Sequence, residues 1–258
     1  MFMTSSLSTT PAPEGTGTGD LRGYSNVVVI TGAGISAASG IATYRDAESG
    51  WVDPDMEAMS HASQYRTHLA RLWPFWSRLR AATAAAAPNS AHLALTAAQT
   101  RVVARGGELT VLTQNIDGLH TRAGTTAVLE LHGSIHRSRC VRRSCGPAFA
   151  DERVLAPGQQ VLGCLRCERP ARPDIVLFGE DLPGKVVHTA VDRLERADLC
   201  LYVGTSGTVS PANSMVTIAR EAGARCVLVN AQPWLMPNPA FHDTILGPAE
   251  VLLPTLLG

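Results

Sequence analysis

A short apolar run that leads directly into a glycine-rich turn is the feature that most constrains the fold of this chain. The run is Asn26–Thr31, and residues 32–40 after it read Gly-Ala-Gly-Ile-Ser-Ala-Ala-Ser-Gly. β-Branched residues favour a buried strand, and closely spaced glycines let the backbone turn tightly and approach a ligand. A strand, a glycine-rich turn and a helix start are typical of a nucleotide-binding α/β unit.

Four further segments share this short, apolar character and predict strands. They are residues 109–113, 128–131, 198–204 and 225–230. Between the last two, residues 211–223 begin with proline and end with glycine, as helices often do. Strands that alternate with helices pair in parallel. The sequence therefore predicts an α/β fold with a Rossmann-like, doubly wound parallel sheet.

Two stretches interrupt the alternation. Residues 41–107 are alanine-rich and contain no convincing strand, which predicts a helical insertion. Residues 135–175 carry four cysteines and no sustained periodicity, which predicts a small module held by something other than a large core. Residues 1–20 are rich in Ser, Thr, Pro and Gly and predict a flexible tail. One domain would then span 21–258, with its Rossmann-like part at about 21–40, 108–134 and 176–258.

The four cysteines form two close pairs, Cys140 with Cys145 and Cys164 with Cys167. Two thiolate pairs joined by a loop can surround a structural zinc ion, and four sulfur ligands leave no open position for catalysis. The alternative is two disulfides. The lack of a recognisable signal peptide disfavours them, because cytosolic thiols stay reduced.

One nearby histidine and the two remaining cysteines lie outside these pairs. His136 is an alternative zinc ligand, but four cysteines complete the set, so we expect a solvated or hydrogen-bonded histidine. Cys200 and Cys226 lie in predicted strands, and we expect both to be buried small apolar side chains.

Charge and hydropathy exclude several classes of function. Lys and Arg total 22, as do Asp and Glu, so the formal net charge is zero. That balance excludes general attraction to nucleic acid or anionic lipid as the basis of function. A local basic cluster is expected to be a solvated face, and the alternative is that it binds an acidic partner or nucleic acid. The cluster comprises Arg137, Arg139, Arg142 and Arg143. No run is apolar enough for a membrane span, and we expect a cytoplasmic protein.

Polar residues follow the predicted strands where ligands bind in open α/β sheets. Residues 113–120 read Thr-Gln-Asn-Ile-Asp-Gly-Leu-His and offer amides and a carboxylate for ribose hydroxyls and a carboxamide. His132 ends another strand and is a general-base candidate, a structural histidine being the alternative. Residues 204–212 form a second small-residue turn suited to the far half of a dinucleotide. The first turn departs from G-x-G-x-x-G. No second strand ending in an acidic residue follows about twenty residues later, which disfavours a dehydrogenase.

This combination of segments resembles the sirtuins, in a bacterial-type form. The resemblance covers the chain from about residue 22 to its end, with the motifs in family order. Its motifs are the glycine-rich turn ending in Tyr44-Arg45, Thr113-Gln-Asn-Ile-Asp117, Leu131-His-Gly-Ser134, the cysteine pairs, Phe178-Gly-Glu180, Gly204-Thr-Ser206 and Val229-Asn230. So many motifs in order make chance agreement negligible.

The resemblance implies an NAD-dependent protein-lysine deacylase, with deacetylation as the first expectation. In that chemistry the acyl group passes to ADP-ribose, and nicotinamide and O-acyl-ADP-ribose are released. His132 matches the family's base, which deprotonates a ribose hydroxyl. Asn115 and Asp117 match residues that hold the ribose and the nicotinamide carboxamide. Breaking the glycosidic bond builds positive charge, so the site must position the acyl oxygen and exclude water.

The resemblance also implies the wider set of contacts. Positions matching NAD contacts are Gly32, Ala33, Gly34, Ser36, Gly40, Tyr44, Arg45, Gln114, Asn115, Ile116, Asp117, Gly204, Thr205, Ser206, Asn230 and Ala249. Positions matching the strip where an acylated peptide adds as an extended strand are Val176, Phe178, Gly179 and Glu180. The partners implied are therefore acylated-lysine proteins or peptides. We expect a monomer without a membrane or specific nucleic-acid partner, although the sequence does not fix the oligomeric state.

Two other functions fit the same NAD site. One is protein mono-ADP-ribosyltransfer, and the other is an idle NAD-binding scaffold whose arginine-rich module recruits partners. Intact Asn115, Asp117 and His132 favour deacylation. Members of the family that prefer acidic acyl groups carry a Tyr-x-x-Arg pair in the helical layer. Trp76 falls near the tyrosine position with no clear pair, which disfavours succinyl- or malonyl-lysine.

Two further departures from the family pattern concern the first motif and the cysteines. Ala42-Thr-Tyr-Arg45 replaces the usual Pro-Asp/Ala-Phe-Arg, which would reshape the nicotinamide pocket while keeping the arginine. The first cysteine pair is wider than the common two-residue spacing. We expect this altered knuckle to affect stability more than chemistry.

Overall fold

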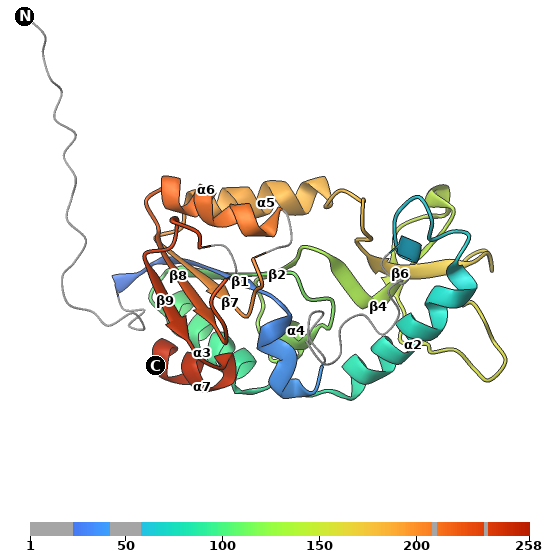
Figure 1. The fold of residues 1–258 in the computed structure, drawn as a ribbon, viewed down its shortest axis with the longest axis horizontal. Helices are drawn as coiled ribbons and strands as arrows, with labels where there is room; N and C mark the ends of the chain where they lie inside the picture. Colours follow the sequence, from blue (N-terminus) through green and yellow to red (C-terminus); the bar gives the residue numbers. More distant parts are fainter. Residues whose placement is uncertain (1–22, 42–57, 208–210, 235–236) are drawn as a thin grey trace, which may run out of the picture.

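The computed structural model of the chain describes residues 23–41, 58–207, 211–234 and 237–258. Its larger part is a six-stranded sheet in the order β3-β2-β1-β7-β8-β9, in which every neighbouring pair is parallel. The strands are β1 Asn26–Thr31, β2 Glu108–Thr113, β3 Val128–Glu130, β7 Leu199–Val203, β8 Arg225–Asn230 and β9 Asp243–Leu246. Figure 1 shows this sheet beside a smaller lobe that contains β4, β6 and α2.

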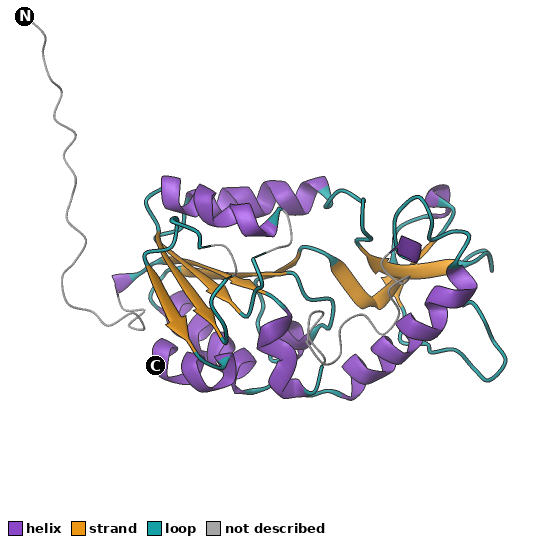
Figure 2. Ribbon diagram, in the orientation of Figure 1, coloured by secondary structure: helices purple, strands orange, loops and turns teal. Residues whose placement is uncertain are grey.

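Helices cover both faces of the six-stranded sheet, so each face has its own apolar core. Helices α3 (Ser90–Ala104) and α7 (Ala249–Leu257) pack on one face, where Leu95 and Leu253 are fully buried. Helices α5 (Gly184–Glu195) and α6 (Met215–Glu221) pack on the other. Figure 2 shows the two helical layers above and below the strands. The arrangement confirms the predicted doubly wound α/β fold.

The strand order reverses at β1, which lies between β2 and β7. In sheets of this kind ligands bind outside the carboxyl ends of the strands at such a switch point. The hydrogen-bond ladder continues one residue past the strands along this edge. Its additional backbone bonds join Leu131 N to Thr113 O, Gln114 N to Thr31 O, Gly32 N to Val203 O, Gly204 N to Val229 O and Gly247 N to Asn230 O.

The smaller lobe is built on an antiparallel sheet in the order β5-β4-β6. Its strands are β4 Gly133–Cys140, β5 Phe149–Ala150 and β6 Ala171–Ile175, and helix α2 is Leu69–Ala85. Trp73 and Trp76 of α2 are buried against Ile135 of β4 and Leu162. The indole N–H of Trp73 donates to Ala171 O over 2.9 Å. Helix α2 therefore supplies a core for a module that the sequence predicted to lack one.

Arg80 joins α2 to this module from the inside. The side chain is fully buried, and its guanidinium donates to Ile135 O, Arg153 O and Ser138 Oγ. Asp151 adds an ion pair at 3.6 Å. A buried arginine is stable only when its donors and charge are matched, and these partners meet that requirement.

The structure divides the predicted helical insertion. Helix α2 belongs to the smaller lobe, whereas α3 packs in the core of the six-stranded sheet through Ala91, Leu95, Ala98 and Val102. The helix expected at 211–223 begins as the short 3-10 helix η4 (Ala212–Ser214) and continues as α6. Strand β9 and the antiparallel sheet were not predicted. Within the described ranges, no helix combines the length and apolar character needed to cross a membrane.

Candidate active site

Two glycine turns meet backbone to backbone at the switch point. Gly34 N donates to Gly204 O over 2.9 Å. A Cβ on Gly34 would lie 2.8 Å from Gly204 Cα, and one on Gly204, where φ is +61°, would lie 2.4 Å from Ile35 N. These contacts leave no room for side chains. The turn after β1 and the turn after β7 thus form one continuous backbone surface at the head of the 3-10 helix η2 (Ala33–Ser39).

A buried hydrogen-bond cluster ties the loop after β2 to η2. Asn115 Nδ2 lies 3.1 Å from both Gly32 O and Ser36 Oγ. Ser36 Oγ donates to Asp117 Oδ2 over 2.7 Å, and Asp117 Oδ1 accepts from Leu119 N. Four of the residues predicted to contact NAD are therefore brought together by direct bonds. Their amide and carboxylate groups suit ribose hydroxyls and a carboxamide.

His132 lies just past β3 and directly before β4, beside this loop. Its Nδ1 is 2.8 Å from Gln114 O, which only accepts, so Nδ1 carries the proton and Nε2 remains the basic nitrogen. Burial lowers the pKa of His132 below its usual value, partly opposed by the bond to Gln114 O. The ring is therefore a neutral base at neutral pH, which is the form that general-base catalysis requires.

Glycine after His132 is required by a close approach of strands. Gly133 has φ of +77°, and a Cβ there would lie 2.1 Å from Asp174 O of β6. Val176 N, just past β6, donates to His132 O over 2.9 Å. The strip predicted to bind substrate thus begins directly beside the predicted base.

The rest of that strip is fastened to the smaller lobe. Glu180 accepts from Arg172 at 2.7 Å and from Leu177 N at 3.0 Å, and Phe178 O accepts from Ala62 N at 2.8 Å. Glu180 therefore holds the strip in shape with its carboxylate already engaged. Phe178 is 38% exposed, so the strip presents an apolar side chain to solvent.

A second buried layer supports the nucleotide loops from below, and sequence analysis did not assign it. Thr31 Oγ1 donates to Thr113 Oγ1 and lies 2.9 Å from Nε2 of His120, which must therefore be the donor. Asn89, the N-cap of α3, donates to Ile35 O and Ser39 Oγ and so fixes η2. The sequence signal for this role was an asparagine directly before the predicted helix, because asparagine is a preferred N-cap residue.

The turn after β7 offers a polar group toward the far half of the site. Asn230 Nδ2 and the Trp234 indole N–H both donate to Thr205 O, at 3.1 and 2.8 Å. The hydroxyl of Thr205 is buried and has no hydrogen-bond partner among the described residues. A buried hydroxyl without a partner is costly, and a diphosphate oxygen would satisfy it. This observation fits the predicted placement of NAD.

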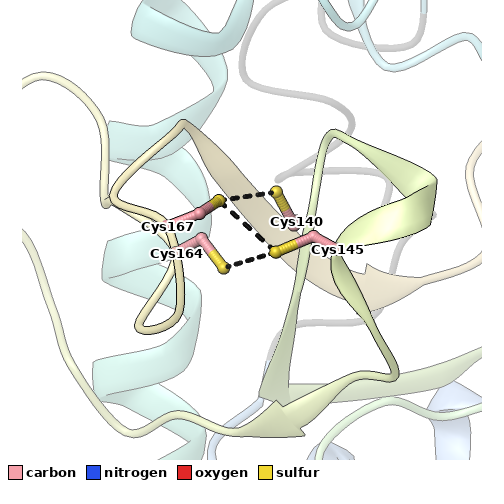
Figure 3. Close-up of side chains that lie close together, drawn as sticks. All are labelled: Cys140, Cys145, Cys164 and Cys167. Carbon is pink, nitrogen blue, oxygen red and sulfur yellow. Dashed lines mark hydrogen bonds between the residues drawn. The ribbon is translucent and has the colours of Figure 1, made fainter.

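Four cysteine sulfurs converge in the smaller lobe. Figure 3 shows Cys140 and Cys145 facing Cys164 and Cys167 from an adjacent loop. Sγ–Sγ separations of 3.4, 3.6 and 3.8 Å occur within the group, and all four sulfurs lie within 4.8 Å of one another. Zn–S bonds of about 2.3 Å in a tetrahedron require sulfurs about 3.8 Å apart, whereas a disulfide is about 2.05 Å long. The geometry fits structural zinc and not disulfides.

Backbone groups complete this cysteine site. Arg142 N and Arg166 N donate to the sulfurs of Cys140 and Cys164, at 3.4 and 3.5 Å. Such bonds stabilise thiolates and orient them toward a metal. Two other predictions about nearby residues are confirmed. His136 lies outside the cluster and is hydrogen-bonded, and Cys200 and Cys226 are buried in apolar strands.

A family model described as "Sir2 family" matches residues 32–211 of this chain. The chain belongs to the Sir2 family. The resemblance to sirtuins found in the sequence is therefore confirmed. Among relatives of this sirtuin, an NAD-dependent protein deacylase of Ralstonia nicotianae is 38% identical over 90% of each chain. One of Thermus thermophilus, with the same description, is 41% identical over 80% of each chain.

Solved sirtuin structures share the fold as well. A Sir2 homologue mutant in complex with ADP-ribose matches with a TM-score of 0.80 and 30% identity over 91% of each chain. A structure described as a Sir2 complex with a p53 peptide and NAD+ matches with a TM-score of 0.78 and 29% identity, over 92% of this chain and 94% of that one.

The remaining predicted NAD contacts of this sirtuin lie along the same edge of the sheet. Gly40 ends η2 with φ of +79°, Ser206 follows Thr205, and Ala249 begins α7 directly after the turn that follows β9. Ile116 packs toward the smaller lobe, and its carbonyl accepts from Ile135 N. Tyr44 and Arg45 lie outside the described residues.

Proposed function

We propose that this sirtuin removes acyl groups from lysine side chains of proteins, using NAD as a consumed co-substrate. The observation that carries the proposal is the neutral His132, fixed by Gln114 O beside both the amide and carboxylate cluster and the peptide strip. A base placed between a nucleotide loop and a substrate strip suits acyl transfer to a ribose hydroxyl. The names of the relatives support the same chemistry.

In this proposal each part of the edge has one task. Backbone groups of the two glycine turns and the buried Thr205 hydroxyl hold the diphosphate. Asn115 and Asp117 hold the ribose and the carboxamide, with Ser36 fixing the Asp117 carboxylate. His132 accepts a proton from the ribose hydroxyl through Nε2, while the strip from Val176 to Glu180 aligns the peptide as an added strand.

We propose acetyl-lysine as the preferred substrate over acidic acyl-lysines. Recognition of an acyl carboxylate needs a cation with free donors. Trp76 is buried in the core of the smaller lobe, packed edge-on against Trp73. Arg80, one turn further along α2, has its guanidinium engaged by three acceptors and Asp151. Neither residue is available to an acidic acyl group.

Zinc would be held by Cys140, Cys145, Cys164 and Cys167 as a structural ion. It would cross-link β4 to the loop that carries Cys164 and would take no part in the reaction. The unpaired thiols also suit a reducing compartment, and we propose a cytoplasmic location on that ground. A monomeric state stays a prediction, which sedimentation would test.

Mass spectrometry of an acetyl-lysine peptide, with and without NAD, tests the proposal. Loss of the acetyl mass should require NAD and should match nicotinamide and O-acetyl-ADP-ribose one to one. ADP-ribose attached to protein in place of deacetylation would support the transferase alternative. Succinyl- and malonyl-lysine peptides in parallel test the acyl preference, which would be wrong if they reacted faster than the acetyl peptide.

A further inference from the structure

His136 lies where three separate parts of the chain meet. Its Nε2 is 3.2 Å from Asp117 O, in the loop predicted to hold nicotinamide, and 3.1 Å from Thr83 Oγ1 on α2. Its Nδ1 is 2.8 Å from Glu152 Oε2, in the segment that follows β5. One imidazole therefore contacts the NAD-site loop, helix α2 and the cysteine module together.

The partners of His136 determine where its protons are. Asp117 O and the Glu152 carboxylate accept hydrogen bonds and cannot donate. The Thr83 hydroxyl already donates to Arg80 O over 3.1 Å, so it too is an acceptor toward His136. Nε2 therefore carries a proton, which is shared between Asp117 O and Thr83 Oγ1, while Nδ1 faces the Glu152 carboxylate at 2.8 Å.

These bonds help to fix the loop that carries Asp117. Ile135 N donates to Ile116 O over 3.0 Å, and the His136 side chain adds a bond to the next carbonyl, Asp117 O. The Asp117 carboxylate is held on its other side by Ser36 and Leu119 N. Asp117 is thus held at its carbonyl by the smaller lobe and at its carboxylate by the larger one.

Helix α2 is tied to the same region by Arg122 of α4 (Leu119–Arg122), the helix that directly follows this loop. Its guanidinium donates to Thr83 O and Ala86 O at the end of α2, over 2.8 and 2.6 Å. Thr83 is therefore anchored by its carbonyl and presents its hydroxyl to His136. The loop and the helix that follows it are therefore both hydrogen-bonded to the end of α2 or to His136.

We propose that His136 is a positioning residue for the nicotinamide half of the NAD site, acting through the Asp117 carbonyl as a hydrogen-bonded bridge between the lobes. The inference rests on the proposed function for what binds at Asp117. It assigns His136 no contact with substrate. Its consequence is selective: NAD binding should depend on the bridge, whereas binding of ADP-ribose, which lacks nicotinamide, should not.

Two amide substitutions separate the halves of the bridge. In His136→Gln the terminal amide lies near the position of Nε2 and can still donate to Asp117 O. In His136→Asn the amide is one bond shorter, near the position of Nδ1, and can reach only toward Glu152. The two variants have similar polarity, so they form a matched pair. Asp192→Ala, in an exposed ion pair on α5, serves as a surface control.

We expect His136→Asn to weaken NAD affinity by about tenfold, as the loss of one hydrogen bond predicts, and His136→Gln to stay within about threefold of wild type. ADP-ribose affinity, KM for the peptide and zinc content should be unchanged in both. In hydrogen exchange, amides of residues 116–118 should open faster in His136→Asn alone.

Equal NAD affinity in the two variants would overturn the proposal. So would a parallel loss of ADP-ribose affinity and melting temperature, which would show a merely structural role. The binding comparison does not need turnover. A wild-type protein that binds NAD but removes no acyl group would refute the proposed function, and the binding comparison between the two variants could still be made. If no nucleotide binds, the hydrogen-exchange comparison of residues 116–118 tests whether His136 positions the loop.

Discussion

The Nδ1 atom of His132 lies 2.8 Å from the carbonyl oxygen of Gln114, the residue that follows β2. This contact joins the base, which lies between β3 and β4, to the loop that carries Asn115 and Asp117. Because the carbonyl can only accept, it selects the tautomer in which Nε2 is unprotonated. The loop that is predicted to hold NAD therefore also prepares the base.

Replacing His132 by alanine should reduce deacylation by about 10²- to 10⁴-fold, the usual contribution of a general base. Zinc content and the melting temperature should change little, because the half-buried ring makes one hydrogen bond to the part of the chain that the structure describes. Product formation is measured by mass spectrometry, with His188→Ala on the exposed face of α5 as the control. Unchanged turnover would remove His132 from the mechanism.

The acid limb of kcat/KM should lie below pH 6.5, the ordinary pKa of histidine. A base works when it is neutral, that is, above its pKa, and burial lowers the pKa of His132. Activity should therefore persist as pH falls through 6.5 and be lost only below it. Rates between pH 5 and 9 with an acetyl-lysine peptide measure this, and a limb above pH 7 would contradict the assigned environment.

His120 should make the fold sensitive to acid. Burial, followed by the neighbouring His92, lowers the pKa of His120 to about 3. The unfolded chain, with a pKa near 6.5, then binds more protons between these values, so stability falls as pH drops through 6.5. The loss attributable to this residue is about 2 kcal/mol at pH 5. Urea unfolding at pH 8 and pH 5 should show a smaller difference for His120→Gln than for His188→Gln.

Gly34→Ala should weaken NAD binding by at least about tenfold and cost about 1–3 kcal/mol of stability, as overpacking does. Its methyl group would lie 2.8 Å from Gly204 Cα, and the nearest atoms are all backbone atoms of Gly204, which cannot rotate away as a side chain could. Gly184→Ala, which meets nothing within 4 Å, is the matched control. Calorimetric titration with NAD checks the expectation, and equal affinities of the two variants would refute it.

Removing zinc, or changing Cys164 to serine, should lower stability and activity together. Metal binding contributes directly to folding of such modules, and the loss should amount to several kcal/mol. Cys226→Ala should keep a full complement of zinc, because Cys226 is a buried strand residue remote from the cluster. Elemental analysis and thermal denaturation report both effects. Full activity in a protein stripped of zinc and unfolded in this module would be incompatible with the assignment.

Five strands of the parallel sheet, all except β9, could be predicted because each is a short apolar run bounded by turns. Residues 26–31 and 225–230 coincide with β1 and β8. Strand β4 could not be found in this way. A register shift between Ser134 and Ser138 breaks the two-residue alternation of buried and exposed positions. Its partner β6 contains Pro173, which is unusual inside a strand, and β9 has only four residues, none of them buried, at the sheet edge.

The helices were recognisable, but their partners were not. Alanine and leucine spacing predicts α3, whereas nothing local indicates that Leu95 faces the large sheet and Trp73 of α2 the smaller one. The site shows the same limit. His132 and the cysteines stand in local motifs, while the layer of Thr31, His120 and Asn89 arises from residues that only the fold brings together.

The extended hydrogen-bond ladder at the carboxyl edge aligns the segments that carry the predicted site residues. Leu131, Gln114, Gly32, Gly204 and Gly247 each continue the ladder by one rung, so the segments beyond start from a common line. One residue added within a strand would shift that line by about 3.3 Å and turn the following side chain to the opposite face. Changes of length are therefore tolerable only beyond the last rung, where loops can vary while the reacting groups stay aligned.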